Sequence, residues 1–457
     1  MTEFTTLPLS TPLLQALSAL NYTAMTPVQA QSLPTLLAGR DLIAQAPTGS
    51  GKTVAFALGL LQRIDPALIR AQALVLCPTR ELADQVGKEI RRLAACIPNI
   101  KLLLLSGGVS LRPQLASLEQ HDPHIVVGTP GRVQELMRKK NLHLGGVRTL
   151  VLDEADRMLD MGFEEAIREI AGKTPPERQS LLFSATFPDP IRRIARSLLR
   201  DPAEVTVADD VAGGTLTQQF FEVDLSAKPN ALARLLLQYS PESSVVFCNT
   251  RRDVDDVAAG LSSAGFAALP LHGEMEQRDR DETLLRFANR SCTVLVASDV
   301  AARGLDIDDL AAVVNYELPT DPDVYLHRIG RTARAGRDGL ALSLCTPREV
   351  PRAIALEALH SMRLQWSKIA AQAAGKSPTL PAMVTLRIDA GRSEKMRPGD
   401  ILGALTGDAG LPAACVGKID VYATRSYVAI RRAESNQALA KLRAGKVKGR
   451  SVRVTRL

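Results

Sequence analysis

A run of small residues that ends in Lys and Thr could do chemistry on phosphates. The run is Thr48-Gly49-Ser50-Gly51-Lys52-Thr53, and it follows a short apolar segment. Glycines let backbone N–H groups converge on one anion, Lys52 adds a charge for the outer phosphates, and the Thr53 hydroxyl suits Mg²⁺. A helix from about Lys52 to Leu61 would point its positive dipole end at the same anion. The run predicts a phosphate-binding loop, although Ala46 stands where the general pattern has Gly.

A second chemical feature is an acidic pair at the end of another apolar segment. The β-prone run Thr149 to Leu152 leads into Asp153-Glu154-Ala155-Asp156. Asp153 would hold Mg²⁺, directly or through water, and Glu154 would orient or deprotonate an attacking water. Carboxylates after a strand can instead simply cap the next helix, and for Asp156 that alternative stays open. Together with the loop, Asp153 and Glu154 predict hydrolysis of a nucleoside triphosphate.

Size and composition limit the classes of protein to consider. A chain of 457 residues, 46% of them hydrophobic, implies two or three domains with ample core. No apolar run approaches the roughly 18 residues of a membrane span, and the first residues lack a basic-then-apolar signal segment. The six cysteines are scattered without a CxxC pair, so neither a zinc site nor a disulfide framework is indicated. We therefore expect a cytoplasmic protein without a membrane partner.

Positive charge is concentrated at the C-terminus. Residues 376–457 contain 16 Lys and Arg against 6 Asp and Glu, a net charge of +10. The whole chain carries +7, so residues 1–375 carry about −3. A small segment with all the excess positive charge favours binding of a polyanion. The alternative is a basic domain that is merely soluble.

Apolar strands alternate with helical patterns through residues 40–345, which is typical of parallel α/β sheets. A weak internal repeat relates Leu74–Arg80 to Val245–Arg251, because each is a strand running into Cys-x-Thr-Arg. It predicts two similar domains, residues 1–208 and 216–375, joined by a hinge near residues 208–215. The expected strands include Ala73–Cys77, Lys101–Leu105, Ile125–Val127, Thr149–Leu152 and Leu181–Phe183.

The chain after Arg352 changes character. A helical pattern runs to about Gly375, and residues 381–457 then follow the order β-α-β-β-α-β of ferredoxin-like RNA-recognition domains. The RNA-stacking aromatics of such domains are nearly absent, since the third strand offers only Tyr427. The expected elements are strand Met383–Ile388, helix Pro398–Thr406, strands Gly417–Val421 and Tyr427–Arg431, helix Ser435–Arg443 and strand Ser451–Arg456. The fold class is therefore α/β, two tandem parallel-sheet domains, with a C-terminal α+β domain.

Taken in order, the motifs resemble those of DEAD-box ATP-dependent RNA helicases, over roughly residues 4–375. The resemblance implies two RecA-like domains that use ATP and Mg²⁺, with Lys52, Asp153 and Glu154 as catalytic residues. Thr26-Pro27-Val28-Gln29 resembles the adenine-recognition motif, so Gln29 would select ATP over GTP and Tyr22 would stack on the base.

The same resemblance assigns roles to short segments of both domains. Ser184 and Thr186 would couple the ATP and RNA sites, together with His327. Asp306 would meet the ribose, and Arg331 and Arg334 would be arginine fingers on the transferring phosphate. In the last motif Ala333 replaces the usual Gly, which removes no charge. RNA-backbone contacts are implied for Pro78, Thr79, Arg80, Gly107, Gly108, Thr129, Gly131, Arg132, Gln277, Arg280, Arg303 and Gly304.

The C-terminal segment narrows the resemblance to the DbpA subfamily. Arg397–Gly407 and Gly417–Asp420 are similar to characteristic stretches of its RNA-binding domain. The subfamily implies binding to a hairpin of 23S ribosomal RNA and action on pre-ribosomal large-subunit particles, and we expect a monomer. Lys446, Lys448 and Arg450 are the candidate RNA contacts of this domain.

The implied mechanism is an ATP-dependent closure of the two RecA-like domains on RNA, which would bend one strand and displace its partner. Three alternatives remain. An ATP-gated RNA clamp, or remodeller of RNA–protein complexes, would hydrolyse ATP without displacing a short duplex. A DNA translocase would be stimulated by DNA as well as RNA. A purely structural protein would have no need of Glu154 and two arginine fingers.

Overall fold

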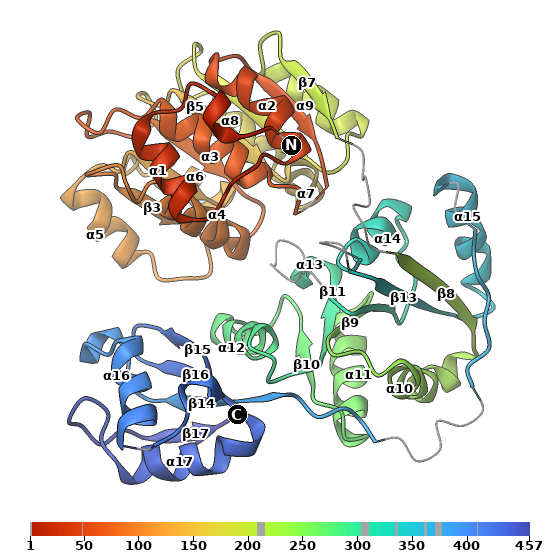
Figure 1. Ribbon diagram of the computed structural model, residues 1–457. Helices are drawn as coiled ribbons and strands as arrows, with labels where there is room; N and C mark the ends of the chain where they lie inside the picture. Colours follow the sequence, from red (N-terminus) through yellow and green to blue (C-terminus); the bar gives the residue numbers. More distant parts are fainter. Residues whose placement is uncertain are drawn as a thin grey trace. The chain divides into compact units, whose positions relative to one another are not determined.

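The computed structural model describes residues 2–47, 49–207, 215–302, 310–333, 337–360, 363–370, 377–408 and 410–457. Contacts divide the chain into two compact units, of which the first contains one sheet and the second contains two (Figure 1). Within these ranges, no helix combines the length and apolarity needed to cross a membrane. Five of the predicted site residues lie outside the described residues: Thr48, Arg303, Gly304, Asp306 and Arg334.

The first unit is built on a seven-stranded parallel sheet with the order β3-β4-β2-β5-β6-β1-β7. Its central strands are buried on both faces, so neighbouring residues enter different cores. In β2, Val75 packs with one core and Leu74 with the other. The strands are β1 (Leu42–Gln45), β2 (Ala73–Leu76), β3 (Leu102–Leu105), β4 (Ile125–Gly128), β5 (Thr149–Asp153), β6 (Gln179–Ser184) and β7 (Ala203–Thr206).

Helices cover both faces of this sheet (Figure 1). The core on one face contains residues of α1 (Thr11–Ala19), α2 (Pro27–Leu37), α3 (Lys52–Gln62) and α4 (Arg80–Leu93). The core on the other face contains residues of α5 (Arg112–Gln120), α6 (Pro130–Arg138), α7 (Ala155–Asp160), α8 (Glu164–Ala171) and α9 (Asp189–Leu198). All five strands expected between residues 73 and 183 are present to within two residues at each end.

The second unit begins with a six-stranded parallel sheet of order β10-β11-β9-β12-β13-β8. Its strands are β8 (Leu216–Glu222), β9 (Ser244–Cys248), β10 (Ala268–Leu271), β11 (Val294–Ser298), β12 (Ala312–Asn315) and β13 (Gly339–Cys345). Its helices are α10 (Lys228–Tyr239), α11 (Arg251–Ser263), α12 (Gln277–Ala288), α13 (Asp299–Ala302), α14 (Pro322–Ile329) and α15 (Val350–His360). The prediction of two RecA-like domains is confirmed, since both parallel sheets are present.

The internal repeat seen in the sequence is a repeat of structure. β2 leads to α4 and β9 leads to α11, and in each case a Thr precedes the helix. The Thr79 hydroxyl accepts a hydrogen bond from Leu82 N at 3.2 Å, and the Thr250 hydroxyl accepts one from Asp253 N at 3.2 Å. Each hydroxyl therefore satisfies a backbone donor that the first turn of a helix leaves unpaired.

The helix predicted to run to about Gly375 is wrong in its extent. α15 ends at His360, and residues 363–370 have no helical structure. Phe220 of β8 exchanges backbone hydrogen bonds with this segment, and the Trp366 ring lies 5.7 Å from the Phe220 ring. Because β8 is an edge strand, the segment satisfies backbone groups that the edge would otherwise expose.

The C-terminal domain has an antiparallel sheet with the order β15-β16-β14-β17. Its elements are β14 (Met383–Ile388), α16 (Pro398–Gly403), β15 (Val416–Val421), β16 (Ser426–Arg431), α17 (Ser435–Ala444) and β17 (Val454–Arg456). The predicted β-α-β-β-α-β order is confirmed, with a last strand shorter than expected. Leu386 and Val428 of the sheet pack against Ile401 of α16 and Leu442 of α17 in one core.

Candidate functional site

The predicted phosphate-binding loop turns sharply between β1 and α3. Gly51 has a φ of +95°, and a Cβ there would lie 2.5 Å from Gln29 Nε2, so a side chain would be both strained and obstructed. Lys52 is buried, and its Nζ donates a hydrogen bond to Ala46 O at 2.6 Å. Ala46 N in turn donates to Ser184 O at 3.1 Å. Ala46 thus takes part through its backbone, and its φ is not in the positive range that favours Gly.

The two acidic residues lie at the carboxyl end of β5, next to this loop. Burial raises the pKa of Asp153 to about 7; the nearby Lys52 opposes that rise and Glu154 adds to it. Glu154 has a φ of +51°, an unfavourable conformation for a residue with a side chain. Its Oε2 is buried and has no hydrogen-bond partner among the described residues, with Arg157 Nε 4.0 Å away. A strained, buried carboxylate with one oxygen that has no hydrogen-bond partner in the described part of the chain, beside a predicted phosphate-binding loop, is typical of a reactive site.

The oxygen ligands at this edge of the sheet suit a divalent cation that is bound together with phosphates. The Asp153 carboxylate and the Thr53 hydroxyl are oxygen ligands of the kind that Mg²⁺ prefers. In the described ranges, no three His, Cys, Asp or Glu side chains are grouped so that they could hold a metal by themselves. Phosphate and water oxygens would therefore have to complete the coordination, as Mg²⁺ sites with nucleotides generally require.

Asp156 contributes to the site in a way that the sequence did not reveal. Its Oδ2 accepts hydrogen bonds from both Thr186 N and Thr186 Oγ1, each at 3.0 Å. Its backbone N donates to Ser184 Oγ at 3.3 Å. Oδ1 accepts from Arg157 N at 3.0 Å within the helix. The helix-capping alternative therefore accounts for only one of the two oxygens of this carboxylate. Asp156 joins the acidic strand end to Ser184 and Thr186, two of the three predicted coupling residues, and only its position in the acidic run could have signalled this.

Gln29 is tied directly to the phosphate-binding loop. Its Oε1 accepts from Thr26 N at 2.9 Å, which caps α2, and its Nε2 donates to Gly51 O at 3.1 Å. Sequence reasoning assigned Gln29 only to adenine and missed both contacts. The half-buried Tyr22 donates its hydroxyl to Glu89 Oε1 at 2.9 Å, and burial, with Glu89, raises the pKa of Tyr22.

Three of the predicted RNA-contact segments follow adjacent strands, β3, β4 and β2. Gly107 N donates to Thr129 Oγ1 at 3.4 Å, so the loops after β3 and β4 are in contact. The Arg132 guanidinium holds the first of these loops by donating to Val109 O at 3.2 Å. Gly108 has a φ of +74° and Gly131 lies in the first turn of α6. Pro78, Thr79 and Arg80 follow β2 at the same edge of the sheet.

The second domain places its predicted residues on α12, α13 and α14. Gln277 begins α12, and Arg280 Nη2 donates to Ala301 O of α13 at 2.9 Å. His327 lies in the last turn of α14, and the buried Arg331 follows that helix.

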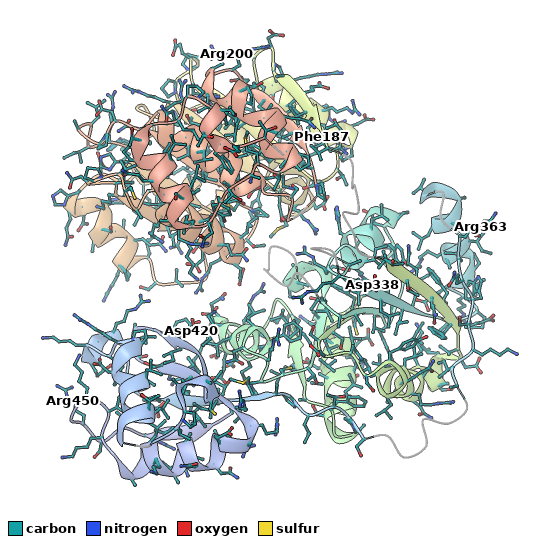
Figure 2. All side chains as sticks on the ribbon, viewed as in Figure 1. Phe187, Arg200, Asp338, Arg363, Asp420 and Arg450 are labelled. Carbon is teal, nitrogen blue, oxygen red and sulfur yellow. The ribbon has the colours of Figure 1, made fainter. Side chains whose placement is uncertain are left out.

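The three predicted RNA contacts of the C-terminal domain are exposed. Lys446, Lys448 and Arg450 lie in the turn between α17 and β17, and Figure 2 shows Arg450 at the surface. Lys448 Nζ lies 3.3 Å from Asp400 Oδ2 of α16, so one of the three has an acidic neighbour. The other basic residues of this domain are spread over its loops, its strands and α17, which carries Lys441 and Arg443.

Models of three protein families match this chain. The DEAD/DEAH box helicase model matches residues 26–194, the helicase conserved C-terminal domain residues 227–336, and the DbpA RNA binding domain residues 385–456. The ATP-dependent RNA helicase DbpA of Escherichia coli is 52% identical over 456 residues, 99% of each chain. The chain belongs to the DEAD-box family of RNA helicases. The resemblance to DbpA is thereby confirmed along the whole length of the sequence.

Other relatives match the helicase core. The helicase CshA of Geobacillus kaustophilus is 43% identical over 351 residues, which is 77% of this chain and 75% of its own. The solved structure of S. cerevisiae Dbp5 bound to RNA and ADP BeF3 has 31% identity and a TM-score of 0.73, over 81% of this chain and 96% of that one. This DEAD-box protein is therefore an ATP-hydrolysing, RNA-binding helicase, which excludes the purely structural alternative.

The RNA-binding domain of this helicase lies in the same compact unit as the second RecA-like domain and contacts it through one face of its sheet. Tyr427 of β16 is buried, and its hydroxyl donates to Glu282 Oε2 of α12 at 3.3 Å. Glu282 Oε2 also lies 3.8 Å from Arg387 Nη1 of β14. Tyr427 is therefore unavailable for stacking on an RNA base, and the missing stacking aromatics have a structural reason.

Proposed function

We propose that this helicase remodels a structured hairpin of 23S ribosomal RNA while the large ribosomal subunit is assembled in the cytoplasm. The observation that carries the proposal is the basic C-terminal domain, which matches the DbpA RNA-binding domain over residues 385–456 and has a net charge of +10 from residue 376 onward. The charge favours RNA phosphates, and the full-length similarity to a bacterial DbpA supports the ribosomal target. We propose domains over residues 1–208, 216–375 and 381–457, acting as a monomer.

For the ATPase site, we propose that the loop Thr48-Gly49-Ser50-Gly51-Lys52-Thr53 binds the phosphates of ATP. Lys52 would leave Ala46 O for the outer phosphates, and Thr53 and Asp153 would hold Mg²⁺, which supplies positive charge to the transferring phosphate. Glu154 would take a proton from the attacking water, a role that its buried Oε2, which has no hydrogen-bond partner among the described residues, supports. Gln29 would bind adenine, with Asp306 at the ribose and Tyr22 against the base.

For the coupling of ATP to RNA, we propose that RNA draws the two RecA-like domains together. Arg331 and Arg334 would then act as arginine fingers, so hydrolysis would depend on RNA. Ser184 and Thr186, held by Asp156, would relay the state of the acidic strand end to the RNA-contact loops, and His327 would take part from the second domain.

The assay of this proposal is the ATPase rate of the full chain with three ligands of equal length. These are RNA that contains the 23S hairpin, RNA of scrambled sequence, and DNA of the hairpin sequence. We expect half-maximal stimulation at a far lower concentration of hairpin RNA than of the other two. Equal stimulation by hairpin and scrambled RNA would contradict the ribosomal target, and equal stimulation by DNA would favour the translocase alternative.

A charge-removal variant tests whether the turn between α17 and β17 gives the specificity for hairpin RNA. Replacing Lys446, Lys448 and Arg450 with Gln should weaken the response to hairpin RNA. It should also flatten the log–log dependence of RNA affinity on salt by about 0.7–0.9 for each phosphate that is no longer neutralised. A matched control replaces Arg192, Arg193 and Arg196, three exposed residues of α9, with Gln. If the control weakens hairpin binding as much, the C-terminal turn is not the specificity element. Displacement of a short duplex, measured alongside, separates a helicase from an ATP-gated clamp.

A further inference from the structure

A buried arginine in the second RecA-like domain has every one of its N–H donors bound to protein. Arg328 of α14 is 1% exposed. Its Nε and one Nη2 donor form a bidentate pair with the two oxygens of Asp299, both at 2.7 Å. The other Nη2 donor binds Asn249 Oδ1 at 2.9 Å. The Nη1 donors bind Asn315 Oδ1 at 3.1 Å and Glu317 O at 2.7 Å. A guanidinium has five donors, so all are used.

The partners of Arg328 come from three different strand ends. Asn249 directly follows β9, Asn315 ends β12, and Asp299 begins α13 directly after β11. Two of them are held in place by further contacts. Asn315 Nδ2 donates to Ser343 Oγ at 3.1 Å, and Asn249 Nδ2 donates to Leu318 O at 3.0 Å. The guanidinium therefore fixes α14 and α13 to the carboxyl edge of the sheet.

Both helices lead into segments that carry proposed functional residues. α14 ends at Ile329 and is followed by Arg331, whose carbonyl accepts from Leu310 N at 3.1 Å. α13 leads directly into the proposed RNA contacts at Arg303 and Gly304, and its Ala301 O accepts from Arg280 of α12. Arg280, a proposed RNA contact, is hydrogen-bonded to Ala301 of α13, and Asp299 of α13 is hydrogen-bonded to Arg328 of α14. These two contacts therefore join Arg280 to α14, which we call the finger helix because the proposed fingers follow it.

We infer that Arg328 is a positioning residue. It holds α14, the helix before the proposed fingers, against α13, the helix before two proposed RNA contacts, so that RNA binding sets the position of the arginine fingers. The inference rests on the proposed finger roles of Arg331 and Arg334. It assigns Arg328 no contact with ATP or RNA. A planar, five-donor fork is needed because Lys has three donors and cannot form the bidentate pair while also reaching two strand ends. Arg328→Lys therefore preserves the charge and removes the geometry.

A second buried ion pair in the same domain provides a matched control. Lys228 of α10 is also 1% exposed, and its Nζ lies 2.7 Å from Glu349 Oε2 and 2.8 Å from Tyr316 O. The exposed fractions of the acidic partners are similar, 14% for Glu349 and 21% for Asp299. The Lys228 partners lie outside α13 and α14. Tyr316 stands between Asn315 and Glu317, two partners of Arg328, but Lys228→Met leaves the Asp299–Arg328 pair between α13 and α14 in place. The variant should therefore destabilise the domain while α14 stays attached to α13.

The experiment measures ATPase rate against RNA and ATP concentration, and the thermal unfolding midpoint, for the full-length wild type and both variants. We expect Arg328→Lys to lower RNA-stimulated kcat about ten- to a hundredfold, the scale on which a 1 Å misplacement acts, with the KM for ATP nearly unchanged. Lys228→Met should lower the unfolding midpoint at least as much and keep kcat. Wild-type kcat in Arg328→Lys, or an equal loss of kcat in Lys228→Met, would overturn the inference.

Two further variants separate this inference from the finger assignment. Arg331→Lys tests the finger directly, and wild-type turnover in that variant would show that the finger proposal is wrong. A loss in Arg331→Lys without a loss in Arg328→Lys would leave the finger standing and refute the positioning role. Asp299→Asn combined with Arg328→Lys should lose no more turnover than the more damaged single variant, because residues that act as one unit are not additive. If the loss of turnover in the double variant equals the product of the losses in the two single variants, the pair does not act as a unit.

Discussion

The contact between the RNA-binding domain and the second RecA-like domain can be tested at one hydroxyl. Thr385 of β14 is fully buried, and its Oγ1 accepts from Asn289 Nδ2 and donates to Ser291 Oγ, both at 2.8 Å. Both partners are themselves buried and follow α12 in the second RecA-like domain. Thr385→Val keeps the shape and suits a strand, but leaves an amide and a hydroxyl without this partner. Each unsatisfied buried group costs about 1–3 kcal/mol, so the contact should weaken by roughly 2–4 kcal/mol if the neighbours relax partly.

Amide hydrogen exchange measured by mass spectrometry reports this weakening. Met383 N, which donates to Arg290 O at 3.3 Å across the contact, should exchange faster in Thr385→Val. By RT ln K, 2–4 kcal/mol corresponds to a factor of about 30 to 900. The core of the C-terminal domain, at Leu386 and Val428, should keep its protection. Thr406→Val is the control, because the Thr406 hydroxyl donates to Leu402 O of α16, inside the C-terminal domain, at 2.9 Å. Exchange at Met383 that is no faster than in the control would refute the reasoning.

Three further outcomes are expected. Glu154→Gln should abolish most hydrolysis while ATP-dependent RNA binding, followed by fluorescence anisotropy, persists; wild-type turnover would refute the role of Glu154 as base. GTP should be a poor substrate, and Gln29→Ala should weaken ATP use. The same variant should lower the unfolding midpoint, because it also removes a helix cap worth about 1 kcal/mol. Equal ATP and GTP turnover in the native protein would contradict the assignment of Gln29 to adenine. Iodoacetamide at pH 7.5 should modify only the exposed Cys96, because the other five thiols are buried and burial raises the pKa of Cys77 well above its usual value; a second modified thiol in the native protein would argue against this packing.

Much of the fold could be predicted because its strands are buried on both faces and separated by helical patterns. β2, β4 and β5 read as short apolar runs, and each was predicted nearly to its ends. The segment after α15 could not be predicted in this way. Its conformation depends on the pairing of Trp366 with Phe220 of β8, which is 146 positions away in the sequence. A local helical pattern carries no information about such a distant edge strand.

The chemical residues of the site could be predicted because their motifs are contiguous in sequence. Lys52 follows its glycines, and Asp153 and Glu154 follow their strand. The residues that hold them could not be predicted, because the fold alone brings these partners together. Asp156 reaches Thr186 across 30 positions, and Arg328 reaches Asn249 across 79. Neither separation has a period that a strand or helix would impose on a sequence.

The burial of one face of the C-terminal sheet constrains how this helicase can read RNA. In the β-α-β-β-α-β arrangement the two helices cover one face, and RNA usually stacks on aromatics of the other. Here that second face carries Thr385, Arg387 and Tyr427, all engaged with the second RecA-like domain. We therefore expect RNA to bind away from this face, where exposed basic residues lie in loops, in β15 and in α17.

Because this face of the sheet is buried against α12, that helix has two functions. α12 holds the RNA-binding domain through Glu282, and its first turn carries Gln277 and Arg280, two of the proposed RNA-backbone contacts. Because a helix rises about 1.5 Å per residue, the distance along α12 between Gln277 and Glu282 is roughly 7–8 Å. Gln277, a proposed sequence-independent RNA contact, therefore lies close on α12 to Glu282. Glu282 is the residue that contacts the domain proposed to select the RNA. Loosening Thr385 should accordingly reduce the advantage of hairpin RNA over scrambled RNA, while leaving stimulation by scrambled RNA intact.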